Sequence, residues 1–303
     1  MNTINRRKLL CRPRGGLNDM VSQIERCCRY AELTNRAVIV DTDYGADSFG
    51  DDFDRYFISR QQHLILSAKG LDHELDCAST FPPSLARRMS SYKSSWDQRK
   101  DGFVERESGE LLTFDFNEDY PHELLVHQQH GRLPISVSIF MRLSLRPELT
   151  KELLARVASI GGPYLGVHVR HTDYRSDYRP LIDQLAGGEI ARLFVATDNR
   201  KVLDEFRAAL PGKQIFSFAE ELSNDGSPIH LRGRRVGNVH RRNCDAILDL
   251  LLLALSVGVV SADLLNGRRD FTKSGFAVLA TELFKQKQYL SGLLGPTVKI
   301  GLD

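Results

Sequence analysis

The chain has 303 residues, of which 42% are hydrophobic and 26% are charged. This composition excludes a mainly disordered, collagen-like or coiled-coil chain, and the length predicts two domains or one large one. Lys and Arg number 41 against 39 Asp and Glu, which gives a net charge of +2. So small a charge gives no general attraction to nucleic acid or to an anionic membrane, so any anion site has to be local.

Cysteine usage and apolar runs bear on the compartment. There are five cysteines, Cys27 and Cys28 are adjacent, and no pair has the C-x-x-C spacing. This pattern argues against a disulfide framework or a structural zinc site and favours a reducing compartment. The longest apolar run, 250–260, is too short to span a bilayer, and residues 1–12 contain no apolar run of signal-peptide length. We therefore expect a cytoplasmic protein without a transmembrane segment.

The first segment predicts a strand, a glycine turn, a helix and a second strand. The first strand is expected over 8–12, followed by a turn over 13–19. Apolar residues recur at helical spacing over 19–34, and 37–41 is a buried strand that ends in an acid. A strand, a crossover helix and a strand in this order form a βαβ unit.

The region 45–119 is less regular and is rich in Asp, Ser and aromatic residues, so we expect loops and short helices there. A further strand is expected over 124–127 and a helix over 145–159. The Gly-Gly-Pro stop at 161–163 closes that helix and is a candidate domain boundary.

A second series of alternating strands and helices follows. Such alternation predicts a parallel sheet covered on both faces. Two series predict an α/β fold with two Rossmann-like, doubly wound domains that face a cleft, with ligands at the carboxyl ends of strands. The strands of this series are expected over 164–170, 192–197, 214–217 and 257–261, and the helices over 181–186, 199–210, 246–255 and 274–284.

The end of the strand over 164–170 carries the sharpest functional pattern. His168 and Arg170 point to one face of this strand, and Asp173 follows in the loop. An arginine at a strand's carboxyl end can hold a phosphate through two parallel hydrogen bonds. Asp173 can fix the guanidinium or the loop, or accept a proton. The alternative interpretation is a solvated loop with surface charges.

The last predicted helix opens with Ser274, Gly275 and Phe276. Ser274 is a good N-cap, and small residues at a helix start expose backbone N–H groups to an anion. The alternative is an ordinary capped helix without a ligand.

A second glycine-containing turn, Gly15 and Gly16 followed by Asn18, lies between the first strand and the first helix. Paired glycines allow a tight turn and a close approach of a ligand. The spacing is not a dinucleotide-binding fingerprint, so a turn without a ligand is the alternative.

Asp249 lies on an otherwise apolar helix, four residues after Asp245. A carboxylate there is costly unless it is paired or faces a site, so Asp249 is a candidate site residue. The basic residues between 232 and 242 form either a solvated face or a flank for a phosphate or an anionic acceptor.

Two pairs resemble metal ligands. Asp41 and Asp43 have the D-x-D spacing of carboxylate pairs that hold a metal ion, but a strand that ends in an acidic loop is the preferred interpretation. His127 and His130 lie beside a strand without an obvious carboxylate partner. We therefore predict no metal site.

Taken together and in their order along the chain, these motifs resemble the sequence signatures of a known protein family. His168, Arg170 and Asp173 form a His-x-Arg-x-x-Asp pattern similar to the first signature of the GDP-fucose fucosyltransferase superfamily. That group includes α1,2-, α1,6- and protein O-fucosyltransferases, and it is the rhizobial nodulation α1,6-fucosyltransferases that the chain resembles most. The other matching segments, in order, are the Gly15-Gly16-Leu17-Asn18 turn, the strand end Val195-Ala196-Thr197-Asp198, Asp249, and Ser274-Gly275-Phe276.

The resemblance implies a GT-B-like fold with an acceptor-side domain over 1–144 and a nucleotide-sugar-binding domain over 145–303. It implies an inverting, metal-independent transfer of fucose from GDP-fucose to a glycan hydroxyl. GDP-fucose is the donor substrate, and no cofactor is implied. Arg170 then stabilises the leaving diphosphate, and His168 and Asp173 shape the same loop. The implied substrate-binding residues are Gly15, Gly16, Asn18, Asp198, Asp249, Ser274, Gly275 and Phe276.

Two other functions stay open. One is a catalytically silent nucleotide- or glycan-binding protein, which turnover of GDP-fucose distinguishes from the enzyme. The other is a histidine phosphatase with His171 as nucleophile, which has Thr172 where a glycine is wanted and carries its motif late in the chain. The sequence does not identify the acceptor, the linkage, the donor sugar, the general base or the oligomeric state.

Overall fold

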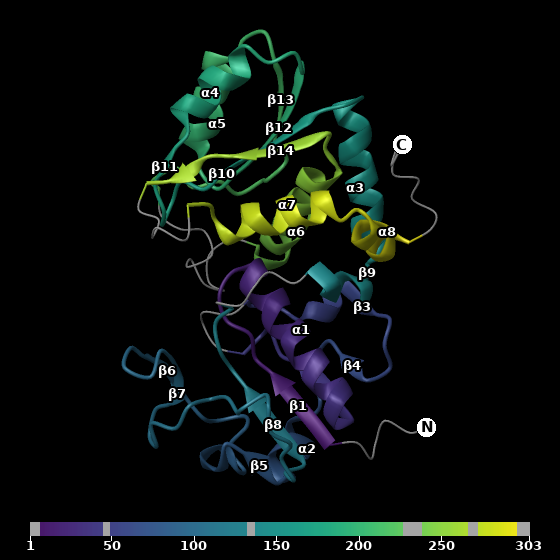
Figure 1. Cartoon of the computed structure of the whole chain (residues 1–303), viewed down its shortest axis with the longest axis vertical. Coiled ribbons are helices and arrows are strands. Elements are labelled where there is room, and N and C mark those ends of the chain that lie inside the picture. Colours follow the sequence, from purple (N-terminus) through teal and green to yellow (C-terminus); the bar gives the residue numbers. More distant parts are fainter. Residues whose placement is uncertain (1–6, 45–48, 132–136, 227–237, 266–271, 296–303) are drawn as a thin grey trace. The chain divides into compact units, whose positions relative to one another are not determined.

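The computed structural model describes residues 7–44, 49–131, 137–226, 238–265 and 272–295. It divides into two compact units, Met1–Ser144 and Leu145–Asp303. Each unit has its own parallel sheet with helices packed against it (Figure 1). The α/β class with two parallel sheets is therefore confirmed, whereas the cleft between the domains stays a prediction.

The first unit is built on the expected βαβ segment. Its sheet has the order β4-β2-β1-β8-β5, and every adjacent pair is parallel. Leu9 and Leu10 in the central strand are fully buried, as both faces of a parallel sheet require. The elements of this core are β1 (Arg7–Cys11), α1 (Leu17–Thr34), β2 (Arg36–Val40), β4 (Leu64–Ile65), β5 (Thr80–Phe81) and β8 (Leu124–His127).

The region expected to hold loops and short helices contains more strand than the sequence predicts. The two edge strands of the sheet, β4 and β5, both lie in it, and β6 and β7 form an antiparallel hairpin. The remaining elements of this unit are short. They are η2 (Phe53–Arg55), β3 (Phe57–Ser59), α2 (Asp72–Cys77), η3 (Pro83–Leu85), β6 (Ser94–Asp97), β7 (Gly102–Glu105), η4 (Val137–Met141) and β9 (Leu143–Leu145) at the end of the unit.

The second unit has a four-stranded parallel sheet in the order β13-β12-β10-β14. The expected strands and helices are all present, and α8 and a short antiparallel pair, β11 with β15, are additional. The strands are β10 (Leu165–Val169), β11 (Ser176–Asp177), β12 (Arg192–Thr197), β13 (Gln214–Phe216), β14 (Gly258–Ser261) and β15 (Asp263–Leu264). The helices are α3 (Pro147–Ile160), α4 (Arg179–Ala186), α5 (Arg200–Ala209), α6 (Val239–Leu255), α7 (Gly275–Lys285) and α8 (Gln288–Leu294).

Alternation along β10 assigns its side chains to the two faces of this sheet. Val167 and Val169 pack in one cluster with residues of α4 and α5. Gly166 faces α6, where an added Cβ would lie 2.9 Å from Ser256 Oγ, so a larger residue would push this helix away. Figure 1 shows α4 and α5 on one side of the sheet and α6 and α7 on the other. His168 therefore belongs to the face covered by α6 and α7.

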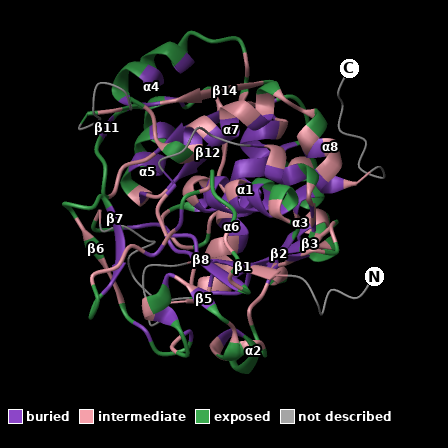
Figure 2. Cartoon of the chain, turned by 60° about the horizontal axis from the view of Figure 1, so that its bottom comes forward, coloured by how far each residue is buried: buried purple, intermediate pink, exposed green. Residues whose placement is uncertain are grey.

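Burial follows these layers. Helix α6 is buried on all sides from Ile247 to Ala254, which explains its nearly continuous apolar sequence. Helix α4 turns an exposed face outwards (Figure 2).

Gly161 ends α3 in the left-handed conformation, at φ 73°. The Gly-Gly-Pro stop at 161–163 thus lies inside the second unit, so its interpretation as a domain boundary is wrong. In the described residues, no helix has both the length and the apolar character needed to cross a membrane.

Candidate functional site

The candidate site is built at the carboxyl ends of three neighbouring strands. β10 pairs in parallel with both β12 and β14, and His168 is aligned with Ala196 on one side and Ser261 on the other. The residues that follow these strand ends therefore lie along one edge of the sheet. Arg170 follows β10 and Asp198 follows β12.

Arg170 is held between two carboxylates. Its Nε donates to Asp173 Oδ1 at 2.7 Å and lies 3.2 Å from Asp198 Oδ2. The arginine side chain is 25% exposed. Burial tends to lower the pKa of Arg170, but its contacts with Asp173 and Asp198 outweigh this and raise that pKa. The guanidinium is thus permanently charged and oriented before any ligand arrives.

Asp198 also organises the loop that follows Arg170. Its carboxylate accepts hydrogen bonds from the backbone N–H of His171 at 2.8 Å and from Thr172 Oγ1 at 2.5 Å. The next residue, Asn199, donates from its side-chain amide to the carbonyl of His171 at 2.8 Å. The strand-ending Thr-Asp pattern therefore fixes the loop that carries Asp173.

His168 contributes a ring rather than a charge. It is 7% exposed, and its ring is stacked on Phe276 of α7 with centroids 5.2 Å apart. Burial, reinforced by the positive charges of Arg170 and Lys273, lowers the pKa of His168 to about 3. His168 is therefore neutral at neutral pH, and of the two basic residues at this strand end only Arg170 is charged.

The start of α7 has the expected cap. Ser274 Oγ accepts a hydrogen bond from the backbone N–H of Ala277 at 3.2 Å, and Gly275 is the first helical residue. Phe276 reaches the site through its stacking on His168. Lys273, the residue before this cap, donates to the carbonyl of Ser261 at the end of β14.

Asp249 lies in a separate cluster between α6 and α3. Its Oδ1 is 3.5 Å from Arg156 Nη1, and neither atom has a hydrogen-bond partner in the described part of the chain. Burial raises the pKa of Asp249 to about 8, although the charge of Arg156 opposes this. Arg156 also binds Asp245 at 2.5 Å, and its guanidinium lies 5.3 Å from the ring of Phe218. Asp249 therefore has a charged partner that the sequence analysis did not identify.

The glycine turn of the first unit is constrained by Asp19. Gly15 has φ +98°, and a Cβ there would lie 2.6 Å from Asp19 Oδ2. The same oxygen accepts a hydrogen bond from the backbone N–H of Gly16 at 3.2 Å. The side-chain oxygen of Asn18 is buried and has no hydrogen-bond partner among the described residues. The turn thus presents an unsatisfied amide oxygen, the kind of group that a ligand can satisfy.

The pairs that resemble metal ligands have protein partners. Asp41 accepts a hydrogen bond from Arg12 Nε at 2.8 Å. His127 is hydrogen-bonded to Thr113 at 2.7 Å and to Gln23, and burial lowers its pKa to about 3. Within the described ranges, no three His, Cys, Asp or Glu residues are grouped to hold a metal ion.

The basic run between 232 and 242 lies partly within the described residues, from 238 onwards. Its arginines at 232, 234 and 235 lie outside the described residues. Arg241 binds Glu152 and Asp245, and Arg242 lies 3.4 Å from Glu221. These two arginines therefore belong to ion pairs of the second unit.

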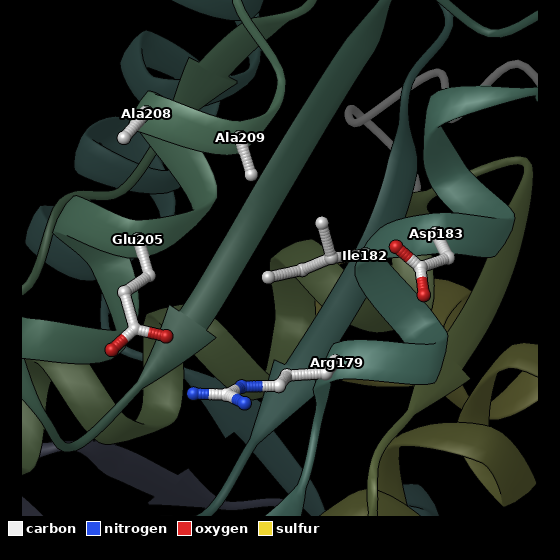
Figure 3. A pocket seen from close by; sticks show the side chains of 6 residues that line it. All are labelled: Arg179, Ile182, Asp183, Glu205, Ala208 and Ala209. Carbon is white, nitrogen blue, oxygen red and sulfur yellow. The ribbon is translucent and has the colours of Figure 1, made fainter.

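A groove of about 490 Å³ lies between α4 and α5 (Figure 3). This is the face of the sheet opposite to that of His168, so the groove is not part of the candidate site. Its lining mixes one cation with two acids and apolar side chains: Arg179, Ile182, Asp183, Glu205, Ala208 and Ala209.

Comparison with solved structures shows which fold this chain has. It has the fold of the GT-B fucosyltransferases, which confirms the predicted resemblance at the level of the fold. A NodZ α-1,6-fucosyltransferase soaked with GDP-fucose is 19% identical, with a TM-score of 0.61 over 92% of this chain and 93% of that one. Fucosyltransferase NodZ from Bradyrhizobium is 21% identical, with a TM-score of 0.59 over 91% and 93%.

A more distant structure, POFUT1 in complex with GDP, is 11% identical, with a TM-score of 0.55 over 97% of this chain and 98% of that one. No protein-family model and no curated protein matches the chain.

Proposed function

We propose that the protein is an inverting, metal-independent glycosyltransferase that moves fucose from GDP-fucose to a glycan hydroxyl in the cytoplasm. The observation that carries this proposal is Arg170, fixed by Asp173 and Asp198 at the carboxyl end of β10. The fold supports it, because similar structures are NodZ soaked with GDP-fucose and POFUT1 in complex with GDP.

The chemistry of the transfer explains why such an arginine is needed. When the bond between the sugar and the diphosphate breaks, its electron pair stays on the phosphate oxygen and the leaving group gains negative charge. A fixed cation stabilises this charge most in the transition state. Because Asp173 and Asp198 hold Arg170 in place beforehand, little reorganisation accompanies bond breaking.

The other residues receive supporting roles in this proposal. The second unit binds the donor and the first unit binds the acceptor. His168 shapes the donor site as a neutral ring, and Asp198 holds the loop of Asp173. The substrate-binding residues assigned here are Gly15, Gly16, Asn18, Asp198, Asp249, Ser274, Gly275 and Phe276.

The phosphatase alternative is disfavoured by the surroundings of His171. A nucleophilic histidine needs one ring nitrogen directed at the phosphorus. In this protein, Nδ1 accepts a hydrogen bond from the backbone N–H of Ser176 at 3.2 Å, and the ring meets Tyr178 edge-on. These contacts fit a histidine that orders the loop.

A ligand panel tests the proposal. Thermal unfolding is followed with GDP, UDP, GDP-fucose and GDP-mannose, each with and without EDTA, and conversion of GDP-fucose to GDP is measured alongside. We expect the guanine nucleotides to raise the melting temperature and GDP-fucose to be turned over. Binding of GDP-fucose without any turnover, in the presence of a wide set of glycans, would instead support the silent binding protein.

A further inference from the structure

A second cation lies beside the strand that carries Arg170. Lys273 precedes the N-cap of α7, and its Nζ donates to the carbonyl of Ser261 in β14. Ser261 is the residue of β14 that is aligned with His168 in β10. The ammonium of Lys273 therefore sits at the carboxyl edge of the sheet, one strand away from Arg170.

The two cations at this edge of the sheet, Arg170 and Lys273, differ in how closely carboxylates neutralise them. Arg170 faces two carboxylates, Asp173 and Asp198, at 2.7 and 3.2 Å. Among the described residues, Lys273 has one acidic partner, Asp263 at 3.0 Å, and the two side chains are 38% and 66% exposed. Such a solvated pair contributes little, so Lys273 can exchange this partner for an anionic ligand at small cost.

The buried ring of His168 experiences the positive charges of both Arg170 and Lys273. This buried ring has its pKa lowered by the charges of Arg170 and Lys273, after the effect of burial itself.

The backbone next to Lys273 adds donors of the same kind. Ala277 N–H is used by Ser274 Oγ, whereas the N–H groups of Gly275 and Phe276 have no partner in the described residues. Unpaired N–H groups in the first turn of a helix attract anions. The lysine and this turn thus present positive potential on one side.

We propose that Lys273 binds the β-phosphate of the donor and stabilises the charge that forms on the leaving diphosphate. The inference rests on the proposed function. In the transfer, the acceptor oxygen bonds to the anomeric carbon, and the bond from that carbon to the β-phosphate oxygen breaks. The electron pair stays on that oxygen, the acceptor proton passes to water, and the diphosphate gains one negative charge that Lys273 and Arg170 share.

A purely structural role for Lys273 makes a different prediction. By binding the carbonyl of Ser261, the lysine ties the end of β14 to the start of α7. If that is all it does, its removal lowers stability and affects every nucleotide alike. A contact with the β-phosphate instead affects only nucleotides that carry that phosphate.

The test is a comparison of GDP and GMP binding by calorimetry in Lys273→Met, Lys273→Arg and the parent. Loss of a charge-assisted hydrogen bond predicts GDP binding about 10- to 100-fold weaker in Lys273→Met, with GMP binding unchanged. Lys273→Arg keeps the charge and should retain most of the GDP affinity. Lys285→Met is the matched control, because Lys285 is exposed in the last turn of the same helix and pairs only with Glu282 among the described residues.

Asp263→Asn is expected to change GDP affinity in the direction opposite to Lys273→Met. Removing the competing carboxylate should tighten GDP binding about 1.5- to 5-fold, the range of an exposed ion pair, and leave GMP binding unchanged. A merely structural lysine would gain nothing from this change. Equal losses of GDP and GMP affinity in Lys273→Met, or no loss of either, would overturn the role of Lys273 while a GDP-binding parent keeps the proposed function. A parent that binds no guanine nucleotide would overturn both.

Discussion

Replacement of Arg170 is the most direct test of the proposed chemistry. Arg170 presents a planar guanidinium whose Nε is fixed by Asp173 and Asp198. Lys carries a single point charge and cannot reproduce the two parallel hydrogen bonds that a guanidinium makes to a diphosphate. Arg170→Lys should therefore be nearly as damaging as Arg170→Ala.

The size of the loss follows from when the charge appears. Single preorganised donors to a developing oxyanion contribute roughly 100- to 1000-fold in turnover, or about 3–4 kcal/mol. Because the negative charge grows as the sugar leaves, turnover should fall by this factor while the affinity for GDP-fucose falls much less.

The fold should survive these changes. Without Arg170, Asp198 still accepts hydrogen bonds from His171 N–H and Thr172 Oγ1, and Asp173 still accepts one from Tyr174 N–H at 3.1 Å. We therefore expect the free energy of unfolding of the Arg170 variants to fall by about 1–2 kcal/mol and their melting temperature to fall by only a few degrees.

The assay measures donor turnover and donor affinity for the Arg170 variants and for His171→Ala, beside the parent. Arg207→Ala is the control, because Arg207 is a half-exposed arginine of α5 that lies 3.9 Å from Asp204. His171→Ala should lose less than either Arg170 variant. Near-parental turnover in Arg170→Ala would refute the reasoning, and a dead His171→Ala beside an active Arg170→Lys would favour the phosphatase.

Four further outcomes are expected. GDP should raise the melting temperature more than UDP, since a ligand that binds only the native state stabilises it by mass action; equal shifts would contradict the guanine assignment. Donor turnover should be unchanged by EDTA, and loss of activity restored by Mn²⁺ or Mg²⁺ would favour the D-x-D interpretation. Asp249→Asn should weaken nucleotide binding and keep the fold, whereas a stabilised, fully active Asp249→Leu would exclude a site role. Burial holds the pKa of His168 at about 3 in the folded state, below its unfolded value, so its contribution to stability is present above about pH 6.5 and is lost as the pH falls towards 3. Denaturant unfolding of His168→Phe should therefore show a weaker loss of stability over this pH range than the parent.

The regular elements could be predicted because their sequence pattern and their burial agree. The strands at Leu124–His127 and Arg192–Thr197 have the predicted ends, since each contains a run of buried apolar residues, 124–126 and 193–196, and lies inside its sheet. The edge strands β4 and β5 have two residues each, and only their pairing with β2 and β8 makes them strands. No local pattern of that length can predict such a pairing.

The first turns of α6 show a second limit. The helix begins at Val239, seven residues before the predicted start, because its first part carries charges instead of an apolar stripe. Arg241 and Arg242 stabilise that part through Glu152 and Glu221. Those acids are distant in the sequence, so the partners become visible only in the fold.

In the candidate site, too, contacts between residues close in the sequence could be predicted, whereas contacts that depend on the fold could not. The contact of Arg170 with Asp173 is local and could be predicted from the strand end, whereas the contact with Asp198 depends on β12 lying next to β10. Arg156 was missed because Glu152 and Arg156, spaced four apart, look like a solvent-facing pair on a helix. In the structure, Arg156 is buried against Asp245 and Asp249.

The two carboxylates beside Arg170 have an energetic consequence for the proposed enzyme. They reduce the net positive charge that a bound donor meets, so they weaken ground-state attraction for the diphosphate. They also fix the guanidinium, so its full stabilisation is available when the leaving group gains its extra charge. An arginine held in this way favours the transition state over the bound donor. Neutralising Asp173 as Asn should therefore tighten binding of GDP-fucose and at the same time slow its turnover, a combination that a simple anion-binding site does not produce.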